Sequence, residues 1–323
     1  MEVHGVFRRP GRMNWPVLGL AIAIAFTAAT AVRAQNQSTI AGVVTDSTAG
    51  VIPDANITIL NSETGARRSI ATNAAGRYEA PLLAAGTYEI TANKQGFDQA
   101  TLRLTLAVGE RAEANLKLSI AAGHQAVDVQ EIPGTTQVTT ADVSGVVSRQ
   151  QVRELPLNGR SYDQLITLNP GVVNYTSQRA GGIGTNNSVI GNMFSASGRR
   201  PQENLYLLNG IEFTSASEIN NTPGGASGQL LGVDAVREFS VVKDDYGAEY
   251  GKRPGAQINI VTASGTDQLH GNAYEFLRNS ALDTRNFFDK GGVPQFQRNV
   301  FGGSLGGPIR KDRTFLFGNY EGY

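Results

Sequence analysis

The chain has 323 residues with 28 acidic and 28 basic side chains, so its formal net charge is zero. A neutral chain gives no argument for a nucleic acid partner or for an anionic membrane surface. The absence of cysteine excludes disulfide bonds and thiolate metal sites, while 38 glycines and a charged fraction of 17% favour turns and strands over long helices.

The N-terminus has the pattern of an export signal. Basic residues at positions 8, 9 and 12 precede an apolar stretch at 17–31, and small residues follow it up to Ala34. This stretch is shorter than the roughly 20 residues that a membrane-spanning helix needs. That favours a secretory signal peptide at 1–34, cleaved after Ala34, over a membrane anchor. Since no second long apolar stretch follows, we expect any membrane-spanning part of the mature chain to be a β-barrel.

Strand-like segments separated by turn residues fill residues 37–120. Apolar residues recur at every second position from Leu102 to Val108 and again from Ala112 to Ile120, so each set lies on one face of a sheet. About seven short strands at even spacing predict a β-sandwich. The expected strands cover residues 39–46, 55–60, 67–72, 77–82, 87–92, 102–108 and 112–120.

Residues 121–137 break this pattern and are expected to form a linker. A short apolar and acidic patch within them consists of Ala126, Val127, Asp128 and Val129, followed by Gln130. Such a segment can add as an extra strand to the open edge of a partner's sheet. An ordinary linker, or the first strand of the next domain, is the simpler interpretation of these residues.

Residues 138–264 mix helical and strand patterns. A short helix is expected at 148–154, because residues before Pro156 avoid helical backbone angles. A second helix is expected to begin at Ser161, where Gln164 completes a capping-box pattern.

The same region contains a hairpin signal and two long loops. Asn209 and Gly210 lie between two apolar segments and supply the positive backbone angles of a tight hairpin turn. The other expected elements are a helical turn at 234–238 and strands at 239–243 and 256–262. Loops at 178–194 and 215–228 are rich in small polar residues, and long ordered loops are usually functional. Together these signals predict a small α+β unit.

The C-terminal residues predict strands. One is expected at 271–278, with Tyr274 and Phe276 facing lipid and Glu275 facing inward. A hairpin of strands 300–306 and 314–323 is expected around a charged turn at 307–313, whose Pro308 cannot donate to a strand ladder. About four such strands fit after Asp267, whereas bacterial barrels have at least about eight. We therefore expect the sequence to be a fragment cut within the first barrel hairpins.

The patterns for enzymes and metal sites are weak. Ser304 lies in a G-x-S-x-G pattern, but no histidine follows it and its flanks predict strands instead of a strand-to-helix turn. The histidines His4, His124 and His270 are far apart and have no spaced ligand partners. We expect no enzymatic activity, no metal and no cofactor.

Two sets of motifs resemble known families. Residues 42–46, 53–57, 73–78 and 82–88 resemble the carboxypeptidase regulatory-like family, a prealbumin-like sandwich whose name implies no peptidase activity here. Residues 151–160, 197–200, 204–211, 233–239, 246–251 and 255–262 resemble the plug domain of TonB-dependent outer-membrane receptors. Residues 267–323 then resemble the first barrel strands of the Oar-like branch, whose members carry the same N-terminal sandwich.

This resemblance implies a mainly β chain: a prealbumin-like β-sandwich, an α+β plug domain and the first strands of an incomplete transmembrane β-barrel. It implies a place in the cell outer membrane, with plug and sandwich accessible to the periplasm. The plug would gate energy-coupled uptake of an unidentified ligand, such as an iron chelate, a glycan or a peptide. TonB, with its inner-membrane energising complex, would be the partner, and the missing barrel would surround the plug.

Candidate site residues follow from the resemblance. The family position of the TonB tether points to Ala126, Val127, Asp128, Val129 and Gln130 as the contact. Candidates on the plug–barrel or ligand side are Arg160, Arg199, Arg200, Asn209 and Gly210. The arginines would pair with carboxylates of the barrel wall through forked hydrogen bonds, with ordinary surface charge as the alternative. The loops at 178–194 and 215–228 would face the ligand. The alternative function is a secreted or periplasmic carbohydrate-binding or adhesion module without transport.

Overall fold

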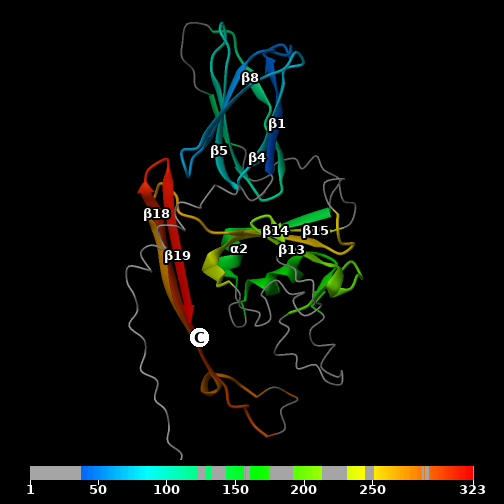
Figure 1. The fold of residues 1–323 in the computed structure, drawn as a ribbon, viewed down its shortest axis with the longest axis vertical. Helices are drawn as coiled ribbons and strands as arrows, with labels where there is room; N and C mark the ends of the chain where they lie inside the picture. The colour runs from blue at the N-terminus through cyan, green and yellow to red at the C-terminus, as the bar shows by residue number, and fades with distance from the viewer. Residues whose placement is uncertain are drawn as a thin grey trace, which may run out of the picture. The chain divides into compact units, whose positions relative to one another are not determined.

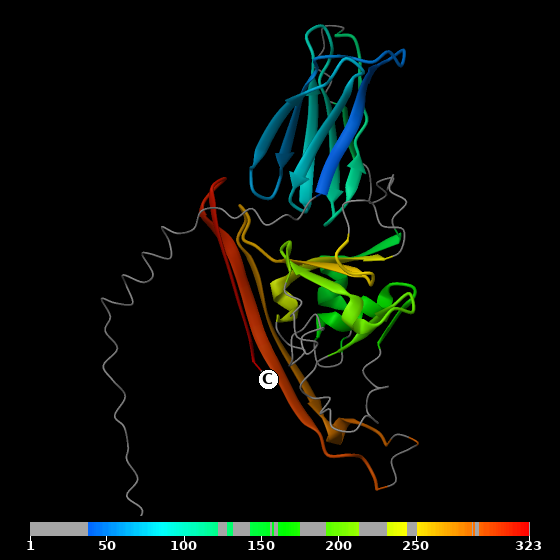
Figure 2. The same cartoon turned by 45° about the vertical axis from the view of Figure 1, so that its right-hand side comes forward.

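Figures 1 and 2 show the computed structural model of the chain. It describes residues 38–121, 128–131, 143–155, 157, 161–174, 192–212, 231–243, 251–285, 287 and 291–322. Strands dominate these ranges, and the predicted mainly β fold class is confirmed. None of the helices found there is long and apolar enough to cross a membrane. The predicted signal peptide lies outside the described residues and stays a prediction.

The N-terminal part is a sandwich of two sheets (Figure 2). Its strands are β1 (Ser38–Asp46), β2 (Asn56–Asn61), β3 (Arg67–Ala71), β4 (Arg77–Leu83), β5 (Gly86–Asn93), β6 (Ala100–Leu106), β7 (Arg111–Glu113), β8 (Leu116–Leu118) and β9 (Asp128–Glu131). One sheet has the order β4-β1-β7, with β8 also paired to β1, and the other has the order β3-β2-β5-β6-β9. Alternate apolar side chains of both sheets form one core, as the period of two predicted.

The last predicted strand of the sandwich is broken. Instead of one strand at 112–120, β7 and β8 flank Ala114 and Asn115, and both pair in parallel with β1. The Asn115 carboxamide oxygen accepts the N–H of Val43 at 2.8 Å, and the Ala114 carbonyl accepts the Tyr78 hydroxyl. These side-chain bonds hold the break together with one backbone bond, from the Ala114 N–H to the Ala41 carbonyl of β1 at 2.7 Å. The predicted buried face ends before Ile120, which is 68% exposed.

The middle unit comprises residues 143–262. Its elements are β10 (Val143–Val147), α2 (Arg149–Glu154), η1 (Tyr162–Leu168), β11 (Val172–Asn174), β12 (Phe194–Ala196), η4 (Pro201–Glu203), β13 (Leu205–Leu208), β14 (Ile211–Glu212), η6 (Val233–Ala235), β15 (Val236–Lys243) and β16 (Gln257–Thr262). The main sheet has the order β10-β15-β16-β13-β14, and β11 pairs with β12. Helix α2 and η1 contribute apolar side chains to the same core, including Tyr162 packed edge-on against Phe239.

Two local signals of the middle unit are confirmed. Helix α2 starts after Ser148 and has both hydrogen bonds of a capping box with Gln151. The β13–β14 hairpin turns at Asn209 and Gly210, whose φ angles are 50° and 80°. Both angles are positive, as a tight turn between twisted strands requires.

The capping box predicted at Ser161 is wrong. The Ser161 side chain caps no backbone N–H, and the helix that follows is a 3₁₀ helix. Its hydroxyl instead donates to a carboxylate oxygen of Asp163 at 2.5 Å. The Ser161 hydroxyl is thus turned toward this carboxylate, which is a strong acceptor for it, and its oxygen accepts none of the backbone N–H groups of the first helical turn.

The C-terminal sheet contains three antiparallel strands in the order β17-β18-β19 (Figure 1). Its elements are β17 (His270–Asn279), η7 (Ser280–Leu282), β18 (Gln297–Arg310) and β19 (Thr314–Gly322). The predicted turn at 307–313 begins too early, because β18 continues through Pro308 to Arg310. A register shift between these two residues accommodates the proline, which has no N–H for the ladder.

The predicted orientation of β17 is also wrong. The Asn272 amide donates to Asp234 of the middle unit at 2.9 Å. Side chains two apart share a face of a strand, so Tyr274 and Phe276 point the same way as Asn272 and line a cavity with residues of α2. They therefore face the middle unit instead of lipid, and Glu275 lies on the opposite face.

A first prediction concerns the close approach of β1 to the break in the last sandwich strand. A Cβ atom added to Gly42 would lie 2.0 Å from the carbonyl oxygen of Ala114. We expect Gly42→Ala to lower the free energy of unfolding by about 2 kcal/mol, because backbone atoms must move. Urea unfolding of the chain measures this change. Gly318→Ala in β19 is the matched control, since a Cβ there would meet no atom within 4 Å. Equal unfolding midpoints for the two variants would contradict the prediction.

Candidate functional site

Several predicted site residues lie outside the described part of the chain. These are Ala126, Val127, Arg160, the loop at 215–228 and most of the loop at 178–194. Their assignments stay predictions.

The described candidates of the middle unit lie at two places. Arg199 and Arg200 are exposed before η4, and the backbone N–H of Arg200 donates to the Glu203 carboxylate at 3.1 Å. Asn209 and Gly210 form the turn after β13, and the Asn209 side chain bonds Thr262 at the end of β16. Because η4 precedes β13 and the turn follows it, the two groups lie at opposite ends of that strand. They do not form one site.

The described part of the predicted TonB contact is a strand. Asp128, Val129 and Gln130 belong to β9, which pairs in parallel with residues 100–103 of β6. This segment therefore already adds to a sheet edge, that of the chain's own sandwich. Its role toward TonB stays a prediction.

A buried carboxylate in η1 was missed by sequence reasoning. Asp163 is fully buried, and it accepts hydrogen bonds from Ser161 and, at 2.9 Å, from Asn192 at the end of the loop predicted to face the ligand. Burial raises the pKa of Asp163, and the two side-chain hydrogen bonds act in the opposite direction. The signal for this pair in the sequence is the Ser-x-Asp spacing of residues 161–163, which lies within the capping-box pattern of Ser161 and Gln164.

A chain of polar contacts joins the middle unit to the C-terminal sheet. Asp234 in η6 is 6% exposed and lies 3.6 Å from the guanidinium of Arg153 in α2. It accepts the Asn272 amide of β17, and the Asn272 oxygen accepts the Ser304 hydroxyl of β18 at 2.7 Å. Three elements, η6, α2 and β17, thus meet at one buried carboxylate, and Asn272 extends the contact to β18. Ser304, the centre of the G-x-S-x-G pattern, is part of this contact within a strand.

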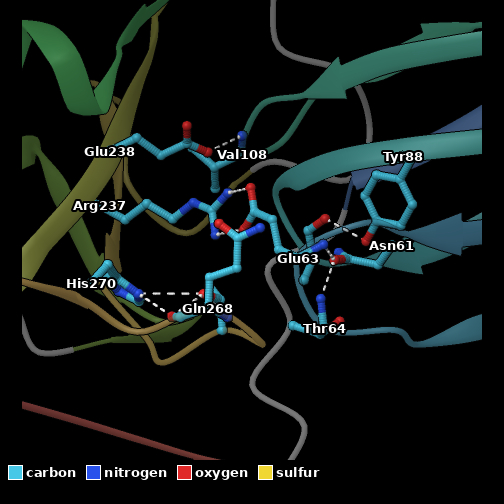
Figure 3. A network of polar contacts seen from close by, with 11 residues as sticks. Asn61, Glu63, Thr64, Tyr88, Val108, Arg237, Glu238, Gln268 and His270 are labelled. Carbon is cyan, nitrogen blue, oxygen red and sulfur yellow. Dashed lines mark hydrogen bonds and ion pairs between the residues drawn. The ribbon is translucent and has the colours of Figure 1, made fainter. Parts of the chain in front are cut away.

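A second set of contacts joins β15 to the sandwich (Figure 3). The Arg237 guanidinium donates two hydrogen bonds to the Glu63 carboxylate, at 2.9 and 3.1 Å. The next residue, Glu238, accepts the backbone N–H of Val108 at 2.8 Å. Burial raises the pKa of Glu238, whereas Arg237 lowers it.

A bulge explains why neighbouring side chains of β15 reach the same region. Successive residues of a regular strand point to opposite faces. The pairing of β15 with β16 shifts register between Val236 and Glu238, and a bulge redirects the side chains beside it. Within the described ranges, no group of three or more acidic or histidine side chains could hold a metal ion.

Comparisons with known proteins identify parts of the chain. Residues 39–119 match the carboxypeptidase regulatory-like domain, and residues 261–323 match the outer membrane beta barrel domain. The TonB-dependent transporter Oar of Myxococcus xanthus is 23% identical over 318 residues, which cover 94% of this chain and 28% of that protein. The chain thus spans about a quarter of the length of this curated relative.

Solved structures show weaker likenesses. The siderophore receptor PirA from Acinetobacter baumannii is 20% identical, with a TM-score of 0.39 over 55% of this chain and 24% of that chain. A ferric enterobactin receptor from Pseudomonas aeruginosa is 18% identical, with a TM-score of 0.38 over 56% of this chain and 25% of that chain. A catechol 1,2-dioxygenase from an Acinetobacter species is 13% identical, with a TM-score of 0.24 over 30% of this chain and 58% of that chain. Scores this low carry no argument about function.

The matched domains define a class, the outer-membrane receptors that carry an N-terminal carboxypeptidase regulatory-like domain. The resemblance drawn from the motifs, to TonB-dependent receptors of the Oar-like branch, is confirmed by the similarity to the curated relative and by the two matched domains.

A second prediction concerns Asp163. Because burial raises its pKa, the folded state holds the proton more tightly than the unfolded chain does. The stabilisation from this group is complete below the unfolded pKa of about 3.9 and is lost as pH rises through the folded pKa. Asp163→Asn removes the charge and keeps groups that can bond Ser161 and Asn192. We expect its gain in melting temperature over the wild type to be larger at about pH 7.5 than at about pH 4.

Thermal unfolding of both chains at the two pH values measures this difference. Asp54→Asn is the control, because Asp54 is exposed and has a positive φ of 52°, which asparagine also tolerates. A gain for Asp163→Asn that did not depend on pH would contradict the prediction.

Proposed function

We propose that this chain is the N-terminal portion of an outer-membrane transporter, in which the middle unit is the plug that gates energy-coupled uptake of a ligand. The order of the matched regions carries this proposal. A carboxypeptidase regulatory-like domain at 39–119 precedes the middle unit, and an outer membrane beta barrel match at 261–323 follows it. The similarity to a TonB-dependent transporter runs through 94% of the chain.

Strand length supports a barrel role for the C-terminal sheet. Strands β17, β18 and β19 have 10, 14 and 9 residues, and a tilted strand needs about 9–11 residues to cross a bilayer. The contacts of Asp234 with Asn272 support a plug role for the middle unit. Polar contacts of this kind hold two parts together and can exchange for water when the parts separate.

The proposed domain order follows the sequence analysis. A signal peptide at 1–34 exports the chain, the sandwich covers 37–120, and a linker covers 121–137. The plug covers 138–264, and the barrel begins at 267. This order places the sandwich and the linker on the periplasmic side, where TonB reaches them. The outer membrane beta barrel match weighs against the alternative of a secreted glycan-binding module without transport.

We assign the TonB contact to Ala126–Gln130, which would pair with TonB by strand addition. The parallel pairing of β9 with β6 supports a segment that readily takes the strand conformation. The ligand belongs to one of three classes, an iron chelate, a glycan or a peptide. Arg160, Arg199, Arg200 and the loops at 178–194 and 215–228 are the proposed contacts on the plug–barrel or ligand side.

A third prediction tests the TonB contact. Deletion of residues 126–130 from the full-length receptor should reduce capture by the purified periplasmic domain of TonB at least about tenfold, because the added strand is lost. Co-purification from detergent-solubilised membranes measures the capture. Deletion of residues 133–137 is the control, since it removes the same length from the same linker. Equal capture of the two deletion variants would refute the assignment.

A further inference from the structure

The turn between β2 and β3 of the sandwich is held in one shape. Asn61 is 5% exposed, and its carboxamide oxygen accepts the N–H groups of Glu63 at 2.9 Å and Thr64 at 3.0 Å. Its backbone carbonyl accepts the N–H of Gly65, and its own N–H donates to Ala66. These four bonds fix the backbone of Glu63 and thereby direct both its carboxylate and its carbonyl. Figure 3 labels Asn61, Glu63 and Thr64 of this turn.

Glu63 contacts two other parts of the chain at once. Its carboxylate pairs with Arg237 of β15, and the two side chains are 29% and 17% exposed. Its carbonyl oxygen accepts the N–H of Asp267, just before β17, at 2.8 Å. A single residue of the sandwich therefore joins the middle unit to the start of the C-terminal sheet.

The neighbouring residues extend this junction. The Asp267 carboxylate accepts the N–H of Asp312 in the turn between β18 and β19 at 2.8 Å. A Cβ atom added to Gly65 would lie 3.1 Å from the Cβ atom of Asp312, so the two turns pack closely. On the side of β15, Glu238 holds the N–H of Val108, and Val108 packs with Ala85 and Val261.

We propose that the turn Asn61–Gly65 is a brace that holds the plug in its closed position against the first barrel hairpin. The inference rests on the proposed function, because it takes the middle unit as the plug and the C-terminal sheet as barrel. It gives the carboxypeptidase regulatory-like domain a role in gating. A plug that moves relative to the barrel must first break the bonds of Glu63 to Arg237 or to Asp267.

The position of β9 links the brace to its release. Strand β9 pairs with β6, so the proposed TonB-contact residues Asp128–Gln130 belong to the same domain as Glu63. A pull on β9 is therefore transmitted through the sandwich sheet to the turn Asn61–Gly65. Withdrawal of the sandwich frees Arg237 and Asp267, and the plug loses the connection to the hairpin that runs through Glu63, while the direct contact of Asp234 with Asn272 remains.

The test uses the full-length receptor in an outer membrane and measures the passage of vancomycin, an antibiotic too large for general porins, in cells that lack TonB. Arg237→Glu places three carboxylates together, and we expect it to raise passage about tenfold over the wild type. Glu63→Gln keeps the shape of the turn and should raise passage less. The exchanged pair Glu63→Arg with Arg237→Glu should return passage to the wild-type level.

Glu89 and Arg103 form the control pair. They make an ion pair of 2.8 Å between neighbouring sandwich strands, and Arg103→Glu should leave passage unchanged. Barrel folding is checked for every variant by heat-dependent electrophoretic mobility. If Arg237→Glu and Glu63→Gln admit no more vancomycin than the wild type at equal amounts of folded receptor, the brace is refuted.

A disulfide provides an independent arm. The chain has no cysteine, so Gly65→Cys with Asp312→Cys can pair only with each other within it. The disulfide fastens the turn to the hairpin and so prevents withdrawal of the sandwich; in cells that contain TonB we expect it to lower TonB-dependent passage of vancomycin, and a reductant to raise it again. The single cysteine variants control for backbone strain at these positions. A disulfide that forms without lowering passage refutes the brace.

TonB capture separates the two proposals. If the receptor binds TonB through residues 126–130 but Arg237→Glu and Glu63→Gln leave vancomycin passage unchanged, the proposed function stands and the brace is refuted. A receptor that never binds TonB fails the proposed function itself.

Discussion

The burial of β15 on both faces is the constraint on which the middle unit depends. Of its eight residues only Arg237 is even partly exposed. Neighbours β10 and β16 occupy both of its edges, so each polar group on it needs a partner within the protein. Glu238 meets this need with a backbone N–H of the sandwich, and Ser240 accepts from Asn259. Because both faces and both edges of β15 are covered, its hydrogen bonds to the sandwich are made at the end of the strand, by Arg237 and Glu238.

The contacts of β15 and η6 therefore concentrate at one end of the middle unit. Asp234 precedes β15 and holds Asn272 of the C-terminal sheet, while Arg237 and Glu238 hold the sandwich. Five consecutive residues thus connect three parts of the chain. The bulge after Val236 allows so many contacts within five residues, because in a regular strand the side chains of Arg237 and Glu238 would point to opposite faces.

Local patterns predicted the elements that depend on local physics. The period of two from Leu102 to Val108 predicted a buried sandwich face, and the Ser148 capping box and the Asn209-Gly210 turn were found as expected. Predictions failed where a residue distant in the sequence determines the local structure. The face of β17 is set by Asp234, 38 residues away.

The candidate site was the least predictable part for the same reason. Glu63 and Arg237 are 174 residues apart, and neither lies in a motif that specifies the other. A carboxylate in a turn and an arginine in a strand both have ordinary surface charge as their simplest interpretation. Only the folded backbone brings them together. The proposed ligand-side residues came from family resemblance, and they lie partly outside the described chain.

The chemistry of the junction around Glu63 has a consequence for how often it can be used. Among the described residues, the apolar cluster at this junction consists of Ala85, Val108 and Val261, and the contacts of Glu63 and Glu238 are made by charged and peptide groups. Water solvates such groups well once they are exposed. Separation of the domains therefore loses little hydrophobic stabilisation and exposes no large apolar surface. An interface of this composition suits repeated dissociation and reassociation of two domains within one molecule. A large apolar interface would instead favour permanent association.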